Sequence, residues 1–126
     1  MSDLPPFELG HPRTELRRQL VAAVLRGEKT ATAGLLEEYE TAGEEVDEPG
    51  SRSVLLGYDD EPAAIVEVTE ARVVPAGEID VEFARDEGEG FDSVEAWRVA
   101  HEEFFGRPLE ADTQVVAIRF RLVERL

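Results

Sequence analysis

The chain has 126 residues, 42% of them hydrophobic and 33% charged, which suits one domain with its own core and leaves no room for two. Its 29 acidic and 13 basic residues give a net charge of −16, which repels phosphate chains and argues against a long RNA partner. The chain has no cysteine, so disulfides, thiolate metal sites and a cysteine nucleophile are excluded.

The N-terminal segment shows no pattern of a targeting signal. Residues 1–9 lack a basic segment followed by an apolar run, and no stretch approaches the roughly 20 apolar residues that cross a bilayer. We therefore expect a cytoplasmic protein that does not contact membranes.

The first half of the chain begins with a segment rich in proline. Residues 1–12 hold three prolines and are expected to form an N-terminal arm outside a single domain at 13–126. Apolar residues at helical spacing predict a helix over 14–26, which ends at Gly27. Lys29 to Thr32 then begins a strand or a tight loop, followed by a short helix around 35–39.

The middle of the chain predicts two paired strands. Residues 41–50 are acidic and contain Pro49-Gly50, which favours a loop. Residues 53–58 and 63–75 are rich in valine, isoleucine and leucine, with a turn at 59–62, so they are expected to pair in antiparallel fashion. The imperfect alternation of 65–71 indicates a strand buried on both faces or bent in a barrel.

The last third predicts two helices and a strand. A short helix at 79–84 is followed by a flexible acidic loop at 86–90 and a capping box from Asp92 to Glu95, which begins a helix over 93–105. Trp97, His101 and Phe104 share one face of that helix and are expected to pack inward. Residues 113–122 alternate as a strand buried on one side.

Lys29 is the only lysine, since the other twelve basic residues are arginines. A lysine amine, unlike a guanidinium, can lose its proton when desolvated and act as a base or nucleophile. The alternative is a solvated lysine after a helix C-terminus, where a cation is favoured by the helix dipole.

The segment Gly27-Glu28-Lys29-Thr30-Ala31-Thr32 resembles the G-x-K-x-x-T motif of the ASCH domain family. The resemblance continues through the strand at 65–70, the loop at 86–91, and Ser93, Trp97, His101 and Phe104-Phe105, and covers roughly residues 16–126. It implies an α+β fold, a PUA-like β-barrel with flanking α-helices. Within the family, the chain resembles the branch of small N4-acetylcytidine amidohydrolase-type members.

The resemblance implies a set of site residues. That branch assigns catalysis to residues matched here by Lys29, Thr32 and Glu87, and we expect Gly27, Thr30, Trp97 and His101 to contact the substrate. That branch also carries an arginine two residues after the threonine, where this chain has Gly34. The departure bears on the identity of the substrate and not on the fold.

Two chemical routes follow for an amide hydrolase. In one, Thr32 attacks and a neutral Lys29 accepts its proton; in the other, a charged Lys29 stabilises the oxyanion while Glu87 activates a water. Structural roles are the alternatives: a strand residue for Thr32, a solvated carboxylate for Glu87, and pocket wall or core for Trp97 and His101.

The sequence thus favours an enzyme, a hydrolase acting on an acylated or modified pyrimidine nucleoside as its small-molecule substrate. Two other functions stay open: a module that binds RNA or a modified base without catalysis, and a ribonuclease. The two histidines and the scattered carboxylates form no ligand spacing, so we expect no metal and no cofactor.

Overall fold

A five-stranded mixed sheet and four α-helices make up residues 4–126, the part of the chain that the computed structural model describes. The expected α+β class is therefore confirmed. In chain order the elements are β1 (Pro6–Phe7), α1 (Glu15–Leu25), β2 (Ala31–Leu35), α2 (Leu36–Ala42), β3 (Arg52–Leu56), β4 (Pro62–Pro75), a 3-10 turn (Ala76–Glu78), α3 (Val81–Asp86), α4 (Val94–Phe105) and β5 (Gln114–Arg125).

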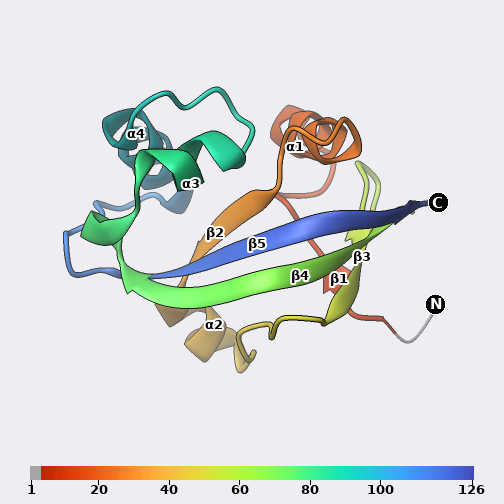
Figure 1. The fold of residues 1–126 in the computed structure, drawn as a ribbon, viewed down its shortest axis with the longest axis horizontal. Helices are drawn as coiled ribbons and strands as arrows, with labels where there is room; N and C mark the ends of the chain where they lie inside the picture. The colour runs from red at the N-terminus through yellow and green to blue at the C-terminus, as the bar shows by residue number, and fades with distance from the viewer. Residues whose placement is uncertain (1–3) are drawn as a thin grey trace.

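The sheet has the strand order β1-β3-β4-β5-β2. The pair β1–β3 is parallel and the other three pairs are antiparallel. Because β1 and β2 remain edge strands in the described residues, the sheet is open, and the barrel that the resemblance implies is not confirmed. The long strands β4 and β5 cross the molecule, with α3 and α4 gathered at one end (Figure 1).

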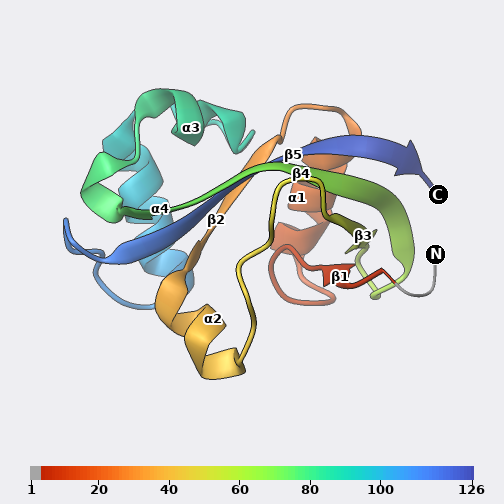
Figure 2. The same cartoon turned by 60° about the horizontal axis from the view of Figure 1, so that its bottom comes forward.

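Irregular pairing bends β4. Its register with β5 shifts between Ile65 and Val66 and again between Val68 and Glu70. Such shifts twist and bend a strand, which fits the imperfect alternation in the sequence. In Figure 2 the β4–β5 pair curves strongly, and α2 and α3 lie on opposite sides of it, as they do in Figure 1.

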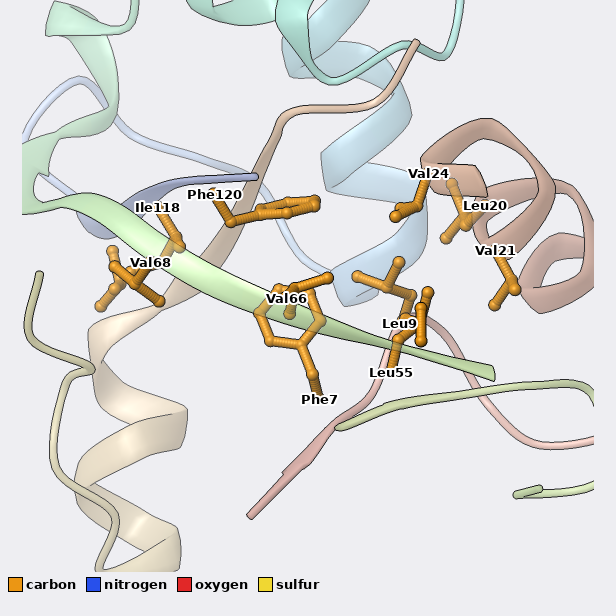
Figure 3. Close-up of a cluster of buried hydrophobic side chains, with 12 residues drawn as sticks. Phe7, Leu9, Leu20, Val21, Val24, Leu55, Val66, Val68, Ile118 and Phe120 are labelled. Carbon is orange, nitrogen blue, oxygen red and sulfur yellow. The ribbon is translucent and has the colours of Figure 1, made fainter. Parts of the chain in front are cut away.

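The first core lies between α1 and the sheet. Leu20, Val21 and Val24 of α1 point toward β4 and β5 (Figure 3). Helical spacing places these three on one face, as the sequence predicts. Their partners from the strands and the N-terminal segment include Phe7, Leu9, Leu55, Val66, Val68, Ile118 and Phe120.

The second core packs α3 and α4 on the opposite face of β2 and β5. Phe83 of α3 and Trp97 of α4 meet the small residues Ala31 and Ala117 there. Alternate residues of β5 therefore enter different cores, and Val115, Val116, Ala117 and Ile118 are all buried. The expectation that this strand is buried on one side is wrong, because helices cover both faces of the sheet.

The expected N-terminal arm is packed onto the domain over its described part. Pro6–Phe7 pairs with Val54–Leu55, and Phe7 and Leu9 are buried in the first core. Proline is tolerated there because an edge strand leaves one row of backbone groups unpaired. Residues 1–3 of the expected arm lie outside the described residues.

Arg17 fixes that segment from α1. Its guanidinium is fully buried and bonds the carbonyls of Leu9, Gly10 and Gly57. It also contacts the carboxylates of Glu8 and Asp60 at 3.4 and 2.6 Å. One side chain thus joins the N-terminal segment to the turn between β3 and β4.

Two details of α4 differ from expectation. The cap is Ser93 and not Asp92, since the Ser93 hydroxyl accepts the Ala96 N–H at 3.0 Å. Trp97 and His101 are buried, but Phe104 is 46% exposed and stacks on His11. The spacing gives the face of the helix correctly, but not how far along the helix that face is covered. Within residues 4–126, no helix has the length and apolar character needed to span a bilayer.

Candidate functional site

Lys29 lies at the centre of a buried charged cluster. It lies four residues after the end of α1, and its backbone N–H bonds the Ala23 carbonyl at 3.1 Å. The residue is only 2% exposed, so it is not the solvated lysine of the alternative interpretation. Its Nζ donates to Ala31 O at 2.8 Å, Glu87 O at 3.2 Å and Glu89 Oε2 at 3.3 Å. Three acceptors match the three N–H donors of an ammonium.

Glu87 is enclosed by donors. Its side chain is 1% exposed, and Oε1 lies 3.6 Å from Lys29 Nζ and 3.3 Å from His101 Nε2. The indole N–H of Trp97 donates to Oε2. Burial raises the pKa of Glu87, but the contact with His101, the charge of Lys29 and the indole bond outweigh it and hold that pKa below its ordinary value. Glu87 is therefore a buried carboxylate and not a solvated one.

His101 faces an acceptor with each ring nitrogen. Nδ1 lies 2.8 Å from the Trp97 carbonyl, and Nε2 faces Glu87. Two facing acceptors favour the imidazolium form, in which both ring nitrogens carry a proton. Burial lowers the pKa of His101, but the Glu87 carboxylate and the Trp97 carbonyl raise it more, so that it lies above its ordinary value. The ring also stacks on Trp97, with centroids 4.3 Å apart.

Helix α4 supplies Trp97 and His101, the two residues that contact the Glu87 side chain from one side. Trp97 and His101 are four residues apart and so lie one turn above the other on the same face. Both turn toward Glu87, which follows α3 directly. The second core under α3 and α4 thus fixes the position of the Glu87 carboxylate, because its partner Trp97 is itself a core residue.

Glu89 is a site residue that sequence reasoning missed. Its Oε2 contacts Lys29, and its side chain is 24% exposed, unlike that of Glu87. Burial raises the pKa of Glu89, Lys29 lowers it and Glu87 raises it, with a net shift above the ordinary value. The sequence predicts a flexible acidic loop at 86–90. The two glycines that flank Glu89 are the signal that could have indicated a defined turn, because both adopt a positive φ.

Gly88 brings this turn against Lys29. Its φ is +70°, and a Cβ there would lie 2.5 Å from Glu28 O and 2.7 Å from Lys29 Cα. Thr30 N–H bonds the Asp86 carbonyl at 2.8 Å on the other side of the same contact. Only glycine allows this close approach of two backbones, so Gly88 sets the distance between Lys29 and the two carboxylates.

A cleft of about 400 Å³ opens beside the cluster, between α1, the 88–91 segment and α4. It is lined by Gln19 and Ala23 of α1, by Arg26 at the C-cap of that helix, by Glu89 and Phe91 of the loop, and by Ala100 of α4. Its volume falls in the range of small-molecule sites. Of the two cluster carboxylates, Glu89 is the one that reaches the cleft wall.

The other expected site residues are placed differently. Thr32 lies in β2 opposite Ile118, so strand alternation puts its side chain on the face of the first core. Within residues 4–126 its hydroxyl makes no hydrogen bond to Lys29 or Glu87. Gly27 and Thr30 are exposed, and the Thr30 hydroxyl donates to the Asp86 carbonyl at 3.4 Å. The structure thus brings together Lys29, Glu87, Trp97 and His101, and leaves these three outside the cluster.

The side chains in residues 4–126 form no group of three or more histidine, aspartate or glutamate residues arranged to hold a metal ion. The absence of a metal and of a cofactor stays a prediction.

Comparison with known proteins gives a consistent result. The model of the ASCH domain family matches residues 9–124. The crystal structure of protein EF3133 from Enterococcus faecalis V583 is 24% identical, covers 96% of this chain and 77% of that chain, and has a TM-score of 0.85. An ASCH domain from Lactobacillus crispatus JV V101 is 27% identical over 95% of this chain and 80% of that chain, with a TM-score of 0.79.

A more distant likeness extends to a mutant of the ZmASCH protein from Zymomonas mobilis, which is 12% identical over 96% of this chain and 73% of that chain, with a TM-score of 0.54. No curated protein matches the sequence. Since the family model spans all but the ends of the sequence, the chain belongs to the ASCH domain family.

Proposed function

We propose that this ASCH domain is a hydrolase that cleaves an acyl amide on a modified pyrimidine nucleoside or a related small amine. One observation carries the proposal: the only lysine of the chain is buried between two carboxylates beside a cleft of ligand size. Taking a lysine and two glutamates out of water costs free energy that apolar side chains of similar volume would not cost. A buried cluster of this kind therefore favours a functional role. Strongly coupled ionisable groups in a cleft are typical of active sites.

Amide hydrolysis needs an activated nucleophile and a group that stabilises the oxyanion. The placement of Lys29 supports the route with an activated water. Its three N–H donors are matched by three acceptors and it does not line the cleft, so it acts as a fixed positive charge that favours the developing oxyanion through its field and not through a direct hydrogen bond. The position of Thr32 opposite Ile118 argues against a direct proton transfer from its hydroxyl to Lys29.

The size of the cleft and its lining support a small substrate. Phe91 and the apolar side of α1 offer a surface for a flat ring, while Gln19 and Arg26 offer hydrogen bonds. The net charge of −16 disfavours a long polyanion at the same place. A neutral nucleoside is small enough for the cleft and is not repelled by the negative charge of the protein.

The test is turnover of a panel of N-acylated nucleosides, with N4-acetylcytidine included, and of simple acyl amides, followed by chromatography. We expect the wild type to release the free amine, and Lys29→Met to lower kcat/KM by about 100-fold or more, because removing one group that stabilises an oxyanion lowers kcat by on the order of 10²–10³-fold. Arg85→Met is the matched control, since it also removes one cation, from an exposed position on α3.

Lys29→Arg serves as a second variant in case the methionine variant does not fold, because it keeps the charge and changes the geometry of the donors. Equal turnover by the wild type and both Lys29 variants would refute the role of Lys29. Binding of the panel by the wild type without any turnover would instead assign recognition of a modified base.

A further inference from the structure

The two cluster carboxylates differ in what they can reach. Both oxygens of Glu87 face donors: Oε1 faces Lys29 and His101, and Oε2 accepts the Trp97 indole N–H. The side chain is 1% exposed and does not line the cleft. A ligand in the cleft cannot touch Glu87 in this arrangement.

Glu89 has the opposite character. One oxygen, Oε2, is held by Lys29 Nζ at 3.3 Å, while Oε1 makes no hydrogen bond or ion pair with residues 4–126. The side chain is part of the cleft wall. Glycines with φ of +70° and +85° on either side hold the backbone turn that aims the carboxylate back toward Lys29. Glu89 therefore presents a free acceptor to a ligand, and its other oxygen is fixed.

We propose that Glu89 is the general base and acid that touches the substrate, and that Glu87 is a positioning residue, which with His101 and Trp97 holds Lys29 in place. This inference rests on the proposed function, since it assigns the proton carrier of that reaction. Glu87 is the residue that the family resemblance implies for catalysis, so the inference moves the reacting carboxylate two residues along the chain.

The proton balance of the reaction closes on Glu89 alone. The Glu89 carboxylate accepts a proton from water as the water oxygen bonds to the amide carbon. The protonated Glu89 then gives this proton to the amide nitrogen as the C–N bond breaks. A carboxylic acid and a free amine leave, and Glu89 returns to the carboxylate. No further reactant is consumed.

The charges around Glu89 suit both halves of that cycle. Lys29 faces it from the segment between α1 and β2, Glu87 from the same loop and His101 from α4, and Arg26, the C-cap of α1, lines the same cleft. Lys29 favours the carboxylate, whereas burial and Glu87 favour the protonated acid and raise the pKa of Glu89. A carboxyl group that exchanges its proton closer to neutral pH serves as both base and acid.

The experiment compares the wild type, Glu89→Gln and Glu87→Gln, with Glu103→Gln as the control at an exposed position of α4. The readouts are kcat and KM for the best substrate of the panel against pH. We expect Glu89→Gln to lower kcat by about 10²-fold or more with little change in KM and to remove the acid limb of the kcat profile. Glu87→Gln should keep that limb, and Glu89→Asp should restore part of kcat.

A second readout does not depend on turnover. Labelling with ¹³C,¹⁵N-lysine gives one side-chain signal, because Lys29 is the only lysine. In the wild type its shift should report the titration of Glu89, and this step should be missing in Glu89→Gln but present in Glu103→Gln.

The outcomes separate the two proposals. Turnover by the wild type that persists in Glu89→Gln overturns the role of Glu89 and leaves the hydrolase standing. Loss of the acid limb in Glu87→Gln but not in Glu89→Gln returns the reaction to Glu87. No turnover by the wild type on the whole panel removes the hydrolase and the proton carrier together.

Discussion

Replacing Gly88 by alanine tests whether the close approach of two backbones holds the candidate site together. A Cβ at this position would lie 2.5 Å from Glu28 O, 2.6 Å from Glu28 C and 2.7 Å from Lys29 Cα, where ordinary contacts begin near 3.4 Å. All three atoms belong to the backbone, so no side chain can rotate away. The loop that carries Glu87 and Glu89 must therefore move away from Lys29.

The expected cost has two parts. A left-handed φ costs an alanine about 1–2 kcal/mol, and relief of the overlap costs roughly 1–3 kcal/mol more, as in overpacked cores. Gly90→Ala isolates the first part, because Gly90 has a φ of +85° but would place its Cβ in open space. We expect Gly88→Ala to lower the free energy of unfolding by about 2–5 kcal/mol and Gly90→Ala by about 1–2 kcal/mol.

Urea unfolding followed by tryptophan fluorescence measures both values. Trp97 is the only tryptophan and its indole N–H bonds Glu87, so the signal comes from the site itself. If the slope of the free energy of unfolding against urea concentration is unchanged, the variant differs from the wild type in stability alone. Losses that agree within about 0.5 kcal/mol for the two alanine variants would refute the argument from backbone contact.

Three further predictions concern charge and packing. Because the pKa of His101 is raised in the fold, the stabilisation that His101 contributes is complete below its ordinary pKa of 6.5 and is lost as pH rises. Because the pKa of Glu87 is lowered, the stabilisation that Glu87 contributes is complete above its ordinary pKa of 4.5 and is lost as pH falls. The free energy of unfolding from this pair should therefore be greatest between those values, and His101→Gln should flatten its alkaline decline in urea titrations at several pH values. Arg17→Met should lower the free energy of unfolding by about 2–4 kcal/mol, since buried carbonyls lose their donor, and it should speed amide hydrogen exchange at residues 6–10. Arg18→Met, which removes an exposed ion pair and a contact with the Tyr58 ring, should lower it by about 1 kcal/mol or less. Thr32→Val should leave kcat unchanged within about threefold, because the side chain faces Ile118; a loss of about tenfold or more would restore Thr32 as the nucleophile.

Local patterns in the sequence predict the elements well where one partner decides burial. The spacing of Leu20, Val21 and Val24 predicts α1 and its buried face, and Thr14 caps the helix as its side chain allows. Strands β3 and β4 and their antiparallel pairing are also confirmed. These features depend on residues that lie close together along the chain.

Patterns fail where burial depends on distant elements. The two-residue strand β1 begins with Pro6 and carries no strand signal of its own; β3 and Arg17 hold it in the sheet. Strand β5 is buried on both faces because α1 lies on one side and α4 on the other, which the alternation of its own residues does not record.

In the candidate site, too, local patterns predict contacts within one element but not contacts between distant elements. The helical spacing of Trp97 and His101 predicts that they share a face, but no local pattern predicts that this face meets Glu87 and Lys29. Only the resemblance to the family placed Lys29 and Glu87 together in advance. The role proposed for Glu89 rests on distances and exposure, because the two glutamates stand in the same run of acidic residues and glycines and the sequence does not distinguish them.

The strand order also governs the making of the protein. Strand β5 lies in the middle of the sheet, between β4 and β2, yet it is synthesised after all of the other described elements. During translation β2 therefore has no paired strand until β5 has been synthesised. Pairing between segments so far apart makes folding slow and leaves edges exposed in the meantime. The residues Ala31 to Gly34 of β2 have short side chains, so before β5 is synthesised they offer little apolar surface to a wrong partner.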